Sequence, residues 1–187
     1  MGAVSRAKPT TKHWVLGLLV FVALAAWPVA KFLFLFPQDQ WQVDVQVYRE
    51  GGLSILQGRD IYAQMTQPPQ LLPFTYPPFA ALLFAPLQWI PLTAAAVVVT
   101  VLSVLALWVC ITLVLRSLNS QEWAAWGLCA AMLTEPITQT FSFGQINILL
   151  TALVVIDLLW VKKARGILTG IAMLIANRRI AASLRRR

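Results

Sequence analysis

The sequence predicts an all-α membrane protein, a polytopic bundle of transmembrane helices. Of its 187 residues, 59% are hydrophobic and only 12% are charged, whereas soluble domains carry about 25% charged residues. The mean hydropathy is strongly positive, at +0.71. The apolar residues come in blocks of about 17 to 25, the length with which a helix crosses the hydrocarbon core of a bilayer. These observations exclude a soluble globular domain as the main fold.

The net charge of +8 could suit a nucleic acid or a membrane surface. The basic residues, however, flank the apolar blocks rather than follow one face. Under the positive-inside rule such clusters are cytoplasmic, so we expect contacts with membrane lipids and no nucleic-acid partner. The flanking basic residues are Arg6, Lys8, Lys12, Arg116, Lys162, Lys163, Arg165 and the three arginines at 185–187.

We expect a basic, cytoplasmic N-terminus at residues 1–13, followed by a transmembrane helix at residues 14–36. A cleaved signal peptide is the alternative, because the basic start and Ala23-Leu24-Ala25 resemble a cleavage site. The anchor is favoured because apolar residues continue to Phe36.

Residues 37–76 form the only sizeable aqueous segment, which we expect outside the cytoplasm, facing the periplasm. Within it, Val45–Gln57 is predicted to form a short helix lying on the membrane, with Gly58 as its stop. Its apolar side is expected to carry Val45, Tyr48, Ile55 and Leu56. Four of the seven acidic residues lie in this segment: Asp39, Asp44, Glu50 and Asp60.

Residues 77–91 are apolar but short and bracketed by prolines, which favours an interfacial or re-entrant helix. Residues 92–176 are predicted to hold further transmembrane helices, before a basic tail at 177–187. The candidate spans are Leu92–Leu115, Glu122 to about Thr140, Ile146–Val161 and the start of another at Ile167–Ala176. The basic clusters fall on the cytoplasmic side in this scheme, provided that residues 77–91 do not cross.

Asp44, in the external segment, is the candidate catalytic residue. A carboxylate within hydrogen-bond reach of an acceptor hydroxyl can take its proton as that hydroxyl attacks a sugar. Asp44 also immediately precedes the predicted helix, and spacing alone favours a simple N-cap. The sequence shows no Gly-rich nucleotide loop and no metal-ligand spacing, so we expect no cofactor and no metal. Cys110 and Cys129 are expected to act as small hydrophobic residues.

Other polar residues suggest substrate contacts. Gln145 and Asn147 lie between two predicted spans, where amides could bind sugar hydroxyls or only cap a helix. Arg49 and Arg59 could hold a phosphate or contact lipid headgroups.

Two acidic residues lie within or near the predicted spans. Thr134-Glu135-Pro136 indicates either a kinked helix facing a polar cavity or an interfacial glutamate. Asp157 is expected to pair with Lys162 or Lys163.

Four segments, in this order, resemble the motifs of a known family: Asp44–Tyr48, Gly58–Tyr62, Phe74–Leu83 and Gly144–Asn147. The family is that of the polytopic mannosyltransferases of mycobacteria and related actinobacteria, glycosyltransferase family 87, with the GT-C fold. The resemblance extends from about Trp14 to Ile175.

The resemblance implies an inverting enzyme that moves mannose from polyprenyl-phosphate-mannose to a lipid-linked glycan acceptor, usually in α-(1→2) linkage. It places Asp44 at the position of the general base. We expect Tyr76, in the third motif, to contact the substrates together with Arg49, Arg59, Gln145 and Asn147.

The chain departs from the family after Gly170-Ile171-Ala172, where members continue into further spans and this sequence ends in arginines. We therefore expect a truncated or frame-shifted product. A non-catalytic membrane fragment or assembly partner and a related arabinofuranosyltransferase stay open as alternatives. Glu135 and Asp157 also leave open a small transporter.

Overall fold

The computed structural model describes residues 11–35, 42–161 and 166–176. Every regular element in these residues is a helix, and the nearest feature to a strand is an isolated antiparallel bridge between Met65 and Pro73. The all-α prediction is therefore confirmed for the described part. The helices are α1 Thr11–Leu35, α2 Val43–Leu56, α3 Pro78–Phe84, η2 Ala85–Trp89, α4 Leu92–Ser117, η3 Gln121–Trp123, α5 Ala124–Met132, α6 Glu135–Phe143, α7 Asn147–Leu159 and α8 Ile167–Ala176.

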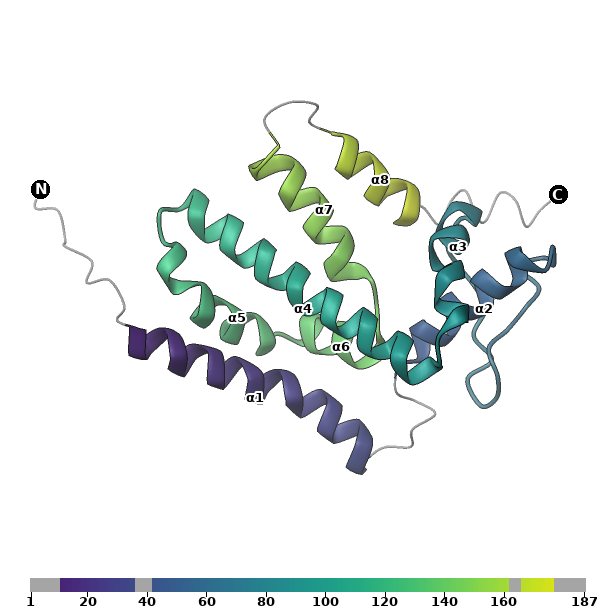
Figure 1. Ribbon diagram of the computed structural model, residues 1–187, viewed down its shortest axis with the longest axis horizontal. Coiled ribbons are helices and arrows are strands. Elements are labelled where there is room, and N and C mark those ends of the chain that lie inside the picture. The colour runs from purple at the N-terminus through teal and green to yellow at the C-terminus, as the bar shows by residue number, and fades with distance from the viewer. Residues whose placement is uncertain (1–10, 36–41, 162–165, 177–187) are drawn as a thin grey trace, which may run out of the picture.

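Five helices pack side by side, each against the next, in the order α1, α5, α4, α7 and α8 (Figure 1). Helix α2 packs against α3 and η2 and lies beside the N-terminal end of α4. One core of apolar side chains joins α1, α4, α5, α6 and α7, and a second core joins α2 and α3 to α7 and α8. The described part of the segment predicted to be external, residues 42–76, therefore packs against the other helices.

Helix α4 is the one helix in the described part that could cross a membrane by length and composition. Its 26 residues correspond to about 39 Å, more than the roughly 30 Å hydrocarbon core. Before Arg116 in its last turn, its large exposed side chains are apolar, which suits a lipid environment: Leu92, Val97, Val98, Val101, Leu102, Leu105 and Val114. Helix α1, which includes most of the predicted helix at 14–36, has 25 residues, whereas α7 and α8 have 13 and 10 and are shorter than a crossing. The number of crossings stays a prediction. The basic clusters at 1–10, 162–165 and 177–187 lie outside the described residues.

The prediction of one continuous span from Glu122 to about Thr140 is wrong. Helices α5 and α6 have nine residues each, about 14 Å, and are separated at Leu133–Thr134. Pro136 explains the break, because it has no N–H to donate to Met132 and its ring would clash with that carbonyl. A broken helix beside Glu135 agrees with the first of the two interpretations of the Thr134-Glu135-Pro136 sequence.

Residues 78–89 form α3 followed by the tighter 3₁₀ helix η2. Together they extend about 20 Å, too short to cross a bilayer. Their predicted position at the membrane surface stays a prediction.

Helix α2 begins two residues earlier than expected and ends before Gly58, whose φ of +63° confirms the predicted stop. Val45 and Tyr48 are buried as predicted, but Leu56 is 53% exposed. Gly51 and Gly52, rather than Leu56, lie on the buried side of α2. A Cβ on Gly52 would lie 2.8 Å from the Cα of Ala85, so this glycine allows the backbone of η2 to approach.

Candidate functional site

Gln42, not Asp44, is the N-cap of α2, so the expectation that Asp44 caps this helix is wrong. Gln42 is 1% exposed and adopts a left-handed backbone, with φ of 55°. Its backbone N–H donates to the carbonyl of Ser142 at 3.1 Å, and its Nε2 donates to the carbonyl of Phe141 at 2.7 Å. Gln42 therefore fastens the start of α2 to the end of α6.

Asp44 lies in the first turn of α2 and is partly buried. The N–H groups at a helix N-terminus create a positive potential there, which favours a negatively charged group nearby. An ionised carboxylate is the form that can accept a proton. The local fold thus suits the predicted base, and the catalytic role itself stays a prediction.

The loop between α6 and α7 holds the fourth motif, Gly144–Asn147, against this first turn. Gly144 has φ of +72°, and a Cβ there would collide with Oε1 of Gln42 and lie 2.7 Å from Cγ2 of Val45. The backbone N–H of Ile146 donates to the Tyr48 hydroxyl at 3.3 Å. Segments about 100 residues apart in the sequence therefore meet beside Asp44.

Tyr76 is buried, and its hydroxyl lies 3.5 Å from the hydroxyl of Tyr48. Burial, with Tyr76 and Asp44 nearby, raises the pKa of the Tyr48 phenol well above its ordinary value. Tyr48 consequently stays neutral and acts as a fixed hydrogen-bonding group. Tyr76 thus packs against Tyr48 of α2 and supports it. Its direct contact with substrates stays a prediction.

Arg49 fastens α2 to η2 and the residue that follows it. Its Nη1 donates to the carbonyl of Leu87 at 2.8 Å and to the carbonyl of Ile90. Gln88 in turn donates from Nε2 to the carbonyl of Arg49. A guanidinium has five N–H donors, so these bonds leave capacity for a phosphate. Arg49 lines a pocket of about 230 Å³ together with Gln46, Glu50, Thr66, Gln67, Gln88 and Leu92.

Arg59 forms an ion pair with Glu50, with 3.2 Å between Nη2 and Oε1. Its Nη1 also donates to Oε1 of Gln64 at 3.1 Å. Glu50 lines the same pocket as Arg49 and is also the ion-pair partner of Arg59. The phosphate-binding role of the two arginines stays a prediction.

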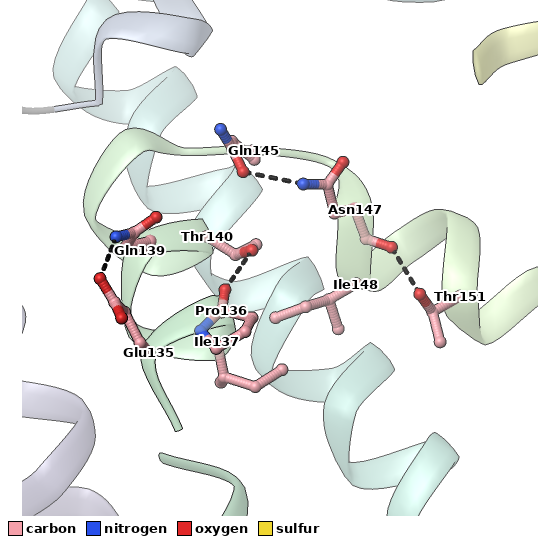
Figure 2. A pocket seen from close by; sticks show the side chains of 9 residues that line it. All are labelled: Glu135, Pro136, Ile137, Gln139, Thr140, Gln145, Asn147, Ile148 and Thr151. Atoms are coloured by element: carbon pink, nitrogen blue, oxygen red, sulfur yellow. Dashed lines mark hydrogen bonds between the residues drawn. The ribbon is translucent and has the colours of Figure 1, made fainter. Parts of the chain in front are cut away.

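The two amides of the fourth motif line a polar pocket of about 590 Å³ between α6 and α7, which we call the α6–α7 pocket (Figure 2). Nδ2 of Asn147 donates to Oε1 of Gln145 at 2.8 Å. On the opposite wall, Nε2 of Gln139 donates to Oε1 of Glu135 at 2.7 Å. The remaining lining residues are Pro136, Ile137, Thr140, Ile148 and Thr151. The sequence predicted that Gln145 and Asn147 act together, but it gave no sign that Glu135 lines the same pocket.

Asp157 is buried at the junction of α7 and α8. Its Oδ2 accepts hydrogen bonds from the backbone N–H of Gly166 at 2.6 Å and from the hydroxyl of Thr169 at 2.7 Å. The carboxylate thus satisfies donors at the start of α8. The predicted lysine partners, Lys162 and Lys163, lie outside the described residues. In the described residues no three metal-binding side chains gather.

Comparison with known proteins gives several related mannosyltransferases. The chain is 36% identical, over 87% of its length, to a Mycolicibacterium smegmatis protein named polyprenol-phosphate-mannose-dependent alpha-(1-2)-phosphatidylinositol mannoside mannosyltransferase. It is 35% identical over 76% of its length to the Mycobacterium tuberculosis protein of the same name. A Mycolicibacterium smegmatis alpha-(1-2)-phosphatidylinositol pentamannoside mannosyltransferase is 37% identical over 63% of the chain and is covered over 30% of its own length.

The chain spans 41% and 37% of the lengths of the first two curated relatives. No solved structure shows a significant match. The model of glycosyltransferase family 87 matches residues 74–176, which include the third and fourth motifs. Because that match covers more than half of the chain, the protein belongs to glycosyltransferase family 87.

Proposed function

We propose that the protein is an inverting mannosyltransferase that moves mannose from polyprenyl-phosphate-mannose to a lipid-linked glycan in the synthesis of cell-envelope glycolipids. The observation that carries the proposal is the junction at which Gln42 holds the first turn of α2, with Asp44, against the Gly144–Asn147 loop. The names of the related proteins supply the donor and the class of acceptor.

In the proposed reaction Asp44 accepts the proton of an acceptor hydroxyl as its oxygen attacks the anomeric carbon of mannose. The bond between that carbon and the phosphate oxygen breaks, and polyprenyl phosphate leaves with the electron pair. Attack from the face opposite the phosphate inverts the anomeric configuration. Arg49 and Arg59 are proposed to bind the phosphate, since guanidinium groups match phosphate oxygens with paired donors.

Membership of the family and the apolar helix α4 indicate a membrane protein. The finer location is part of the proposal: a multi-pass protein of the plasma membrane whose site faces the periplasm. Its support is the distribution of basic residues in the sequence under the positive-inside rule. A substrate pair in which both members carry lipid anchors also requires a site at the membrane surface.

The test is transfer of labelled mannose from polyprenyl-phosphate-mannose to a phosphatidylinositol mannoside, in membranes containing the full chain. Asp44→Asn is expected to reduce transfer by about 10²–10⁴-fold, the usual contribution of a general base. Asp60→Asn is the matched control, since Asp60 is exposed and its carboxylate accepts from the N–H of Tyr62 in a turn.

Equal transfer by wild type and Asp44→Asn would remove Asp44 from the mechanism. No transfer by an inserted chain, where a full-length relative works in parallel, would instead support a non-catalytic membrane partner. Transfer from a polyprenyl-phosphate-arabinose donor, but not from the mannose donor, would indicate the related arabinofuranosyltransferase.

A further inference from the structure

The side chains of the α6–α7 pocket offer more hydrogen-bonding groups than the two bonds between them use. Each bond, from Gln139 to Glu135 and from Asn147 to Gln145, uses one N–H and one oxygen. A carboxylate has two oxygens, and an amide side chain has one oxygen and two N–H groups. The side chains of Glu135, Gln139 and Asn147 are exposed. The pocket can therefore present both donors and acceptors to a ligand.

This combination suits the hydroxyl groups of a sugar, each of which both donates and accepts a hydrogen bond. The pocket volume of about 590 Å³ lies within the range of about 300–1,000 Å³ that is usual for small-molecule sites. None of the described residues that line it is basic, so its chemistry does not favour a phosphate. The arginines of the external segment lie elsewhere: Arg49 lines the separate pocket of about 230 Å³, and Arg59 pairs with Glu50.

Apolar surface lies directly beside the polar pocket. Thr151 also lines a second pocket, of about 300 Å³, formed by α7 and α8, and its other lining residues are Leu150, Val154, Ala172, Met173 and Ala176. Leu133, just before α6, is 75% exposed. A polar site within apolar surroundings suits an amphiphile, because the sugar and the hydrocarbon chain each meet a matching surface.

We propose that the α6–α7 pocket binds the sugar of the lipid-linked acceptor, with Glu135 accepting hydrogen bonds from its hydroxyls and the second pocket, between α7 and α8, holding its hydrocarbon chain. This assignment rests on the proposed function and identifies the acceptor side of the site. Gln145 lines the pocket and follows Gly144, which packs against the first turn of α2. A sugar in the pocket is thereby brought to the loop that lies beside Asp44.

The experiment is equilibrium binding of radiolabelled phosphatidylinositol mannoside to the purified full chain in detergent, without any donor. Glu135→Gln should weaken binding about ten-fold, because a charged acceptor is replaced by a neutral one. Gln keeps an oxygen for Gln139, so the fold should survive. Glu122→Gln is the matched control: Glu122 lies in η3 and does not line the pocket. Asn147→Ala, on the opposite wall, should also weaken binding.

Phosphatidylinositol, which lacks the mannose, should bind more weakly and without a difference between wild type and Glu135→Gln. Asp44→Asn should bind the acceptor like wild type. A wild-type chain that binds the acceptor tightly but shows no transfer would refute the proposed reaction and leave the acceptor site standing. Unchanged binding in Glu135→Gln would overturn the assignment. A larger loss of affinity for polyprenyl-phosphate-mannose than for the acceptor would also overturn it, since the pocket would then be the donor site.

Discussion

Replacing Gly144 with alanine should disrupt the junction that positions Asp44. Gly144 has φ of +72°, and a left-handed backbone costs a residue with a Cβ about 1–2 kcal/mol. The new methyl would also displace the buried amide of Gln42, which bonds Phe141 at 2.7 Å and Thr100 at 3.3 Å. Each lost hydrogen bond costs about 0.5–1.5 kcal/mol. The expected total loss of stability is therefore about 2–5 kcal/mol.

Gly58→Ala supplies the matched control. Gly58 has a similar φ of +63°, but a Cβ there meets nothing within 4 Å. Gly58→Ala should therefore lower the stability only by the backbone term, about 1–2 kcal/mol. The difference of about 1–3 kcal/mol predicts a thermal midpoint about 2–12 °C lower for Gly144→Ala than for Gly58→Ala, by the scaling for domains of this size.

The assay is thermal unfolding of the full chain in detergent, followed by the fluorescence of its eight tryptophans. Gly144→Ala should cost less in a Gln42→Ala background, where the collision with Oε1 is absent. Equal midpoints for the two glycine variants would refute the reasoning. So would a cost of Gly144→Ala that does not depend on residue 42.

Three further predictions concern Gly52 and Tyr48 in α2 and Gly170 in α8. Gly52→Ala should destabilise the protein by about 1–3 kcal/mol, because its Cβ would press on the backbone of Ala85 at 2.8 Å. Gly170→Ala, in α8 with nothing within 4 Å, should instead stabilise by about 0.5–1 kcal/mol, and opposite shifts of the thermal midpoint would confirm both effects. The raised pKa of Tyr48 means that the folded state holds its proton more tightly than the unfolded state, so stability should fall as the pH rises above about 10. Tyr48→Phe should reduce this slope in midpoints measured between pH 8 and 11, and an unchanged slope would exclude Tyr48 as its source.

Much of the secondary structure could be predicted because it depends on local features. The apolar run after Pro91 forms α4, and Gly58 ends α2 through its own backbone conformation. The break before α6 follows from Pro136, a local feature, although the apolar run from Glu122 to about Thr140 was predicted as one span. The order of the four motifs also sufficed to identify the family, since that resemblance lies in the sequence itself.

The helical class, the apolar blocks and the family could thus be predicted from the amino-acid sequence, which also supplied Asp44 as the candidate base. Only the tertiary structure showed that Gln42 caps α2, that Gly144 leaves room for its amide, and that Glu135 faces the motif amides across one pocket. The physical reason is distance along the chain: Gln42 bonds a carbonyl 99 residues away, and Tyr48 bonds an N–H 98 residues away. Local propensity and periodicity carry no information about such partners, which are fixed when α2 packs against the α6–α7 loop.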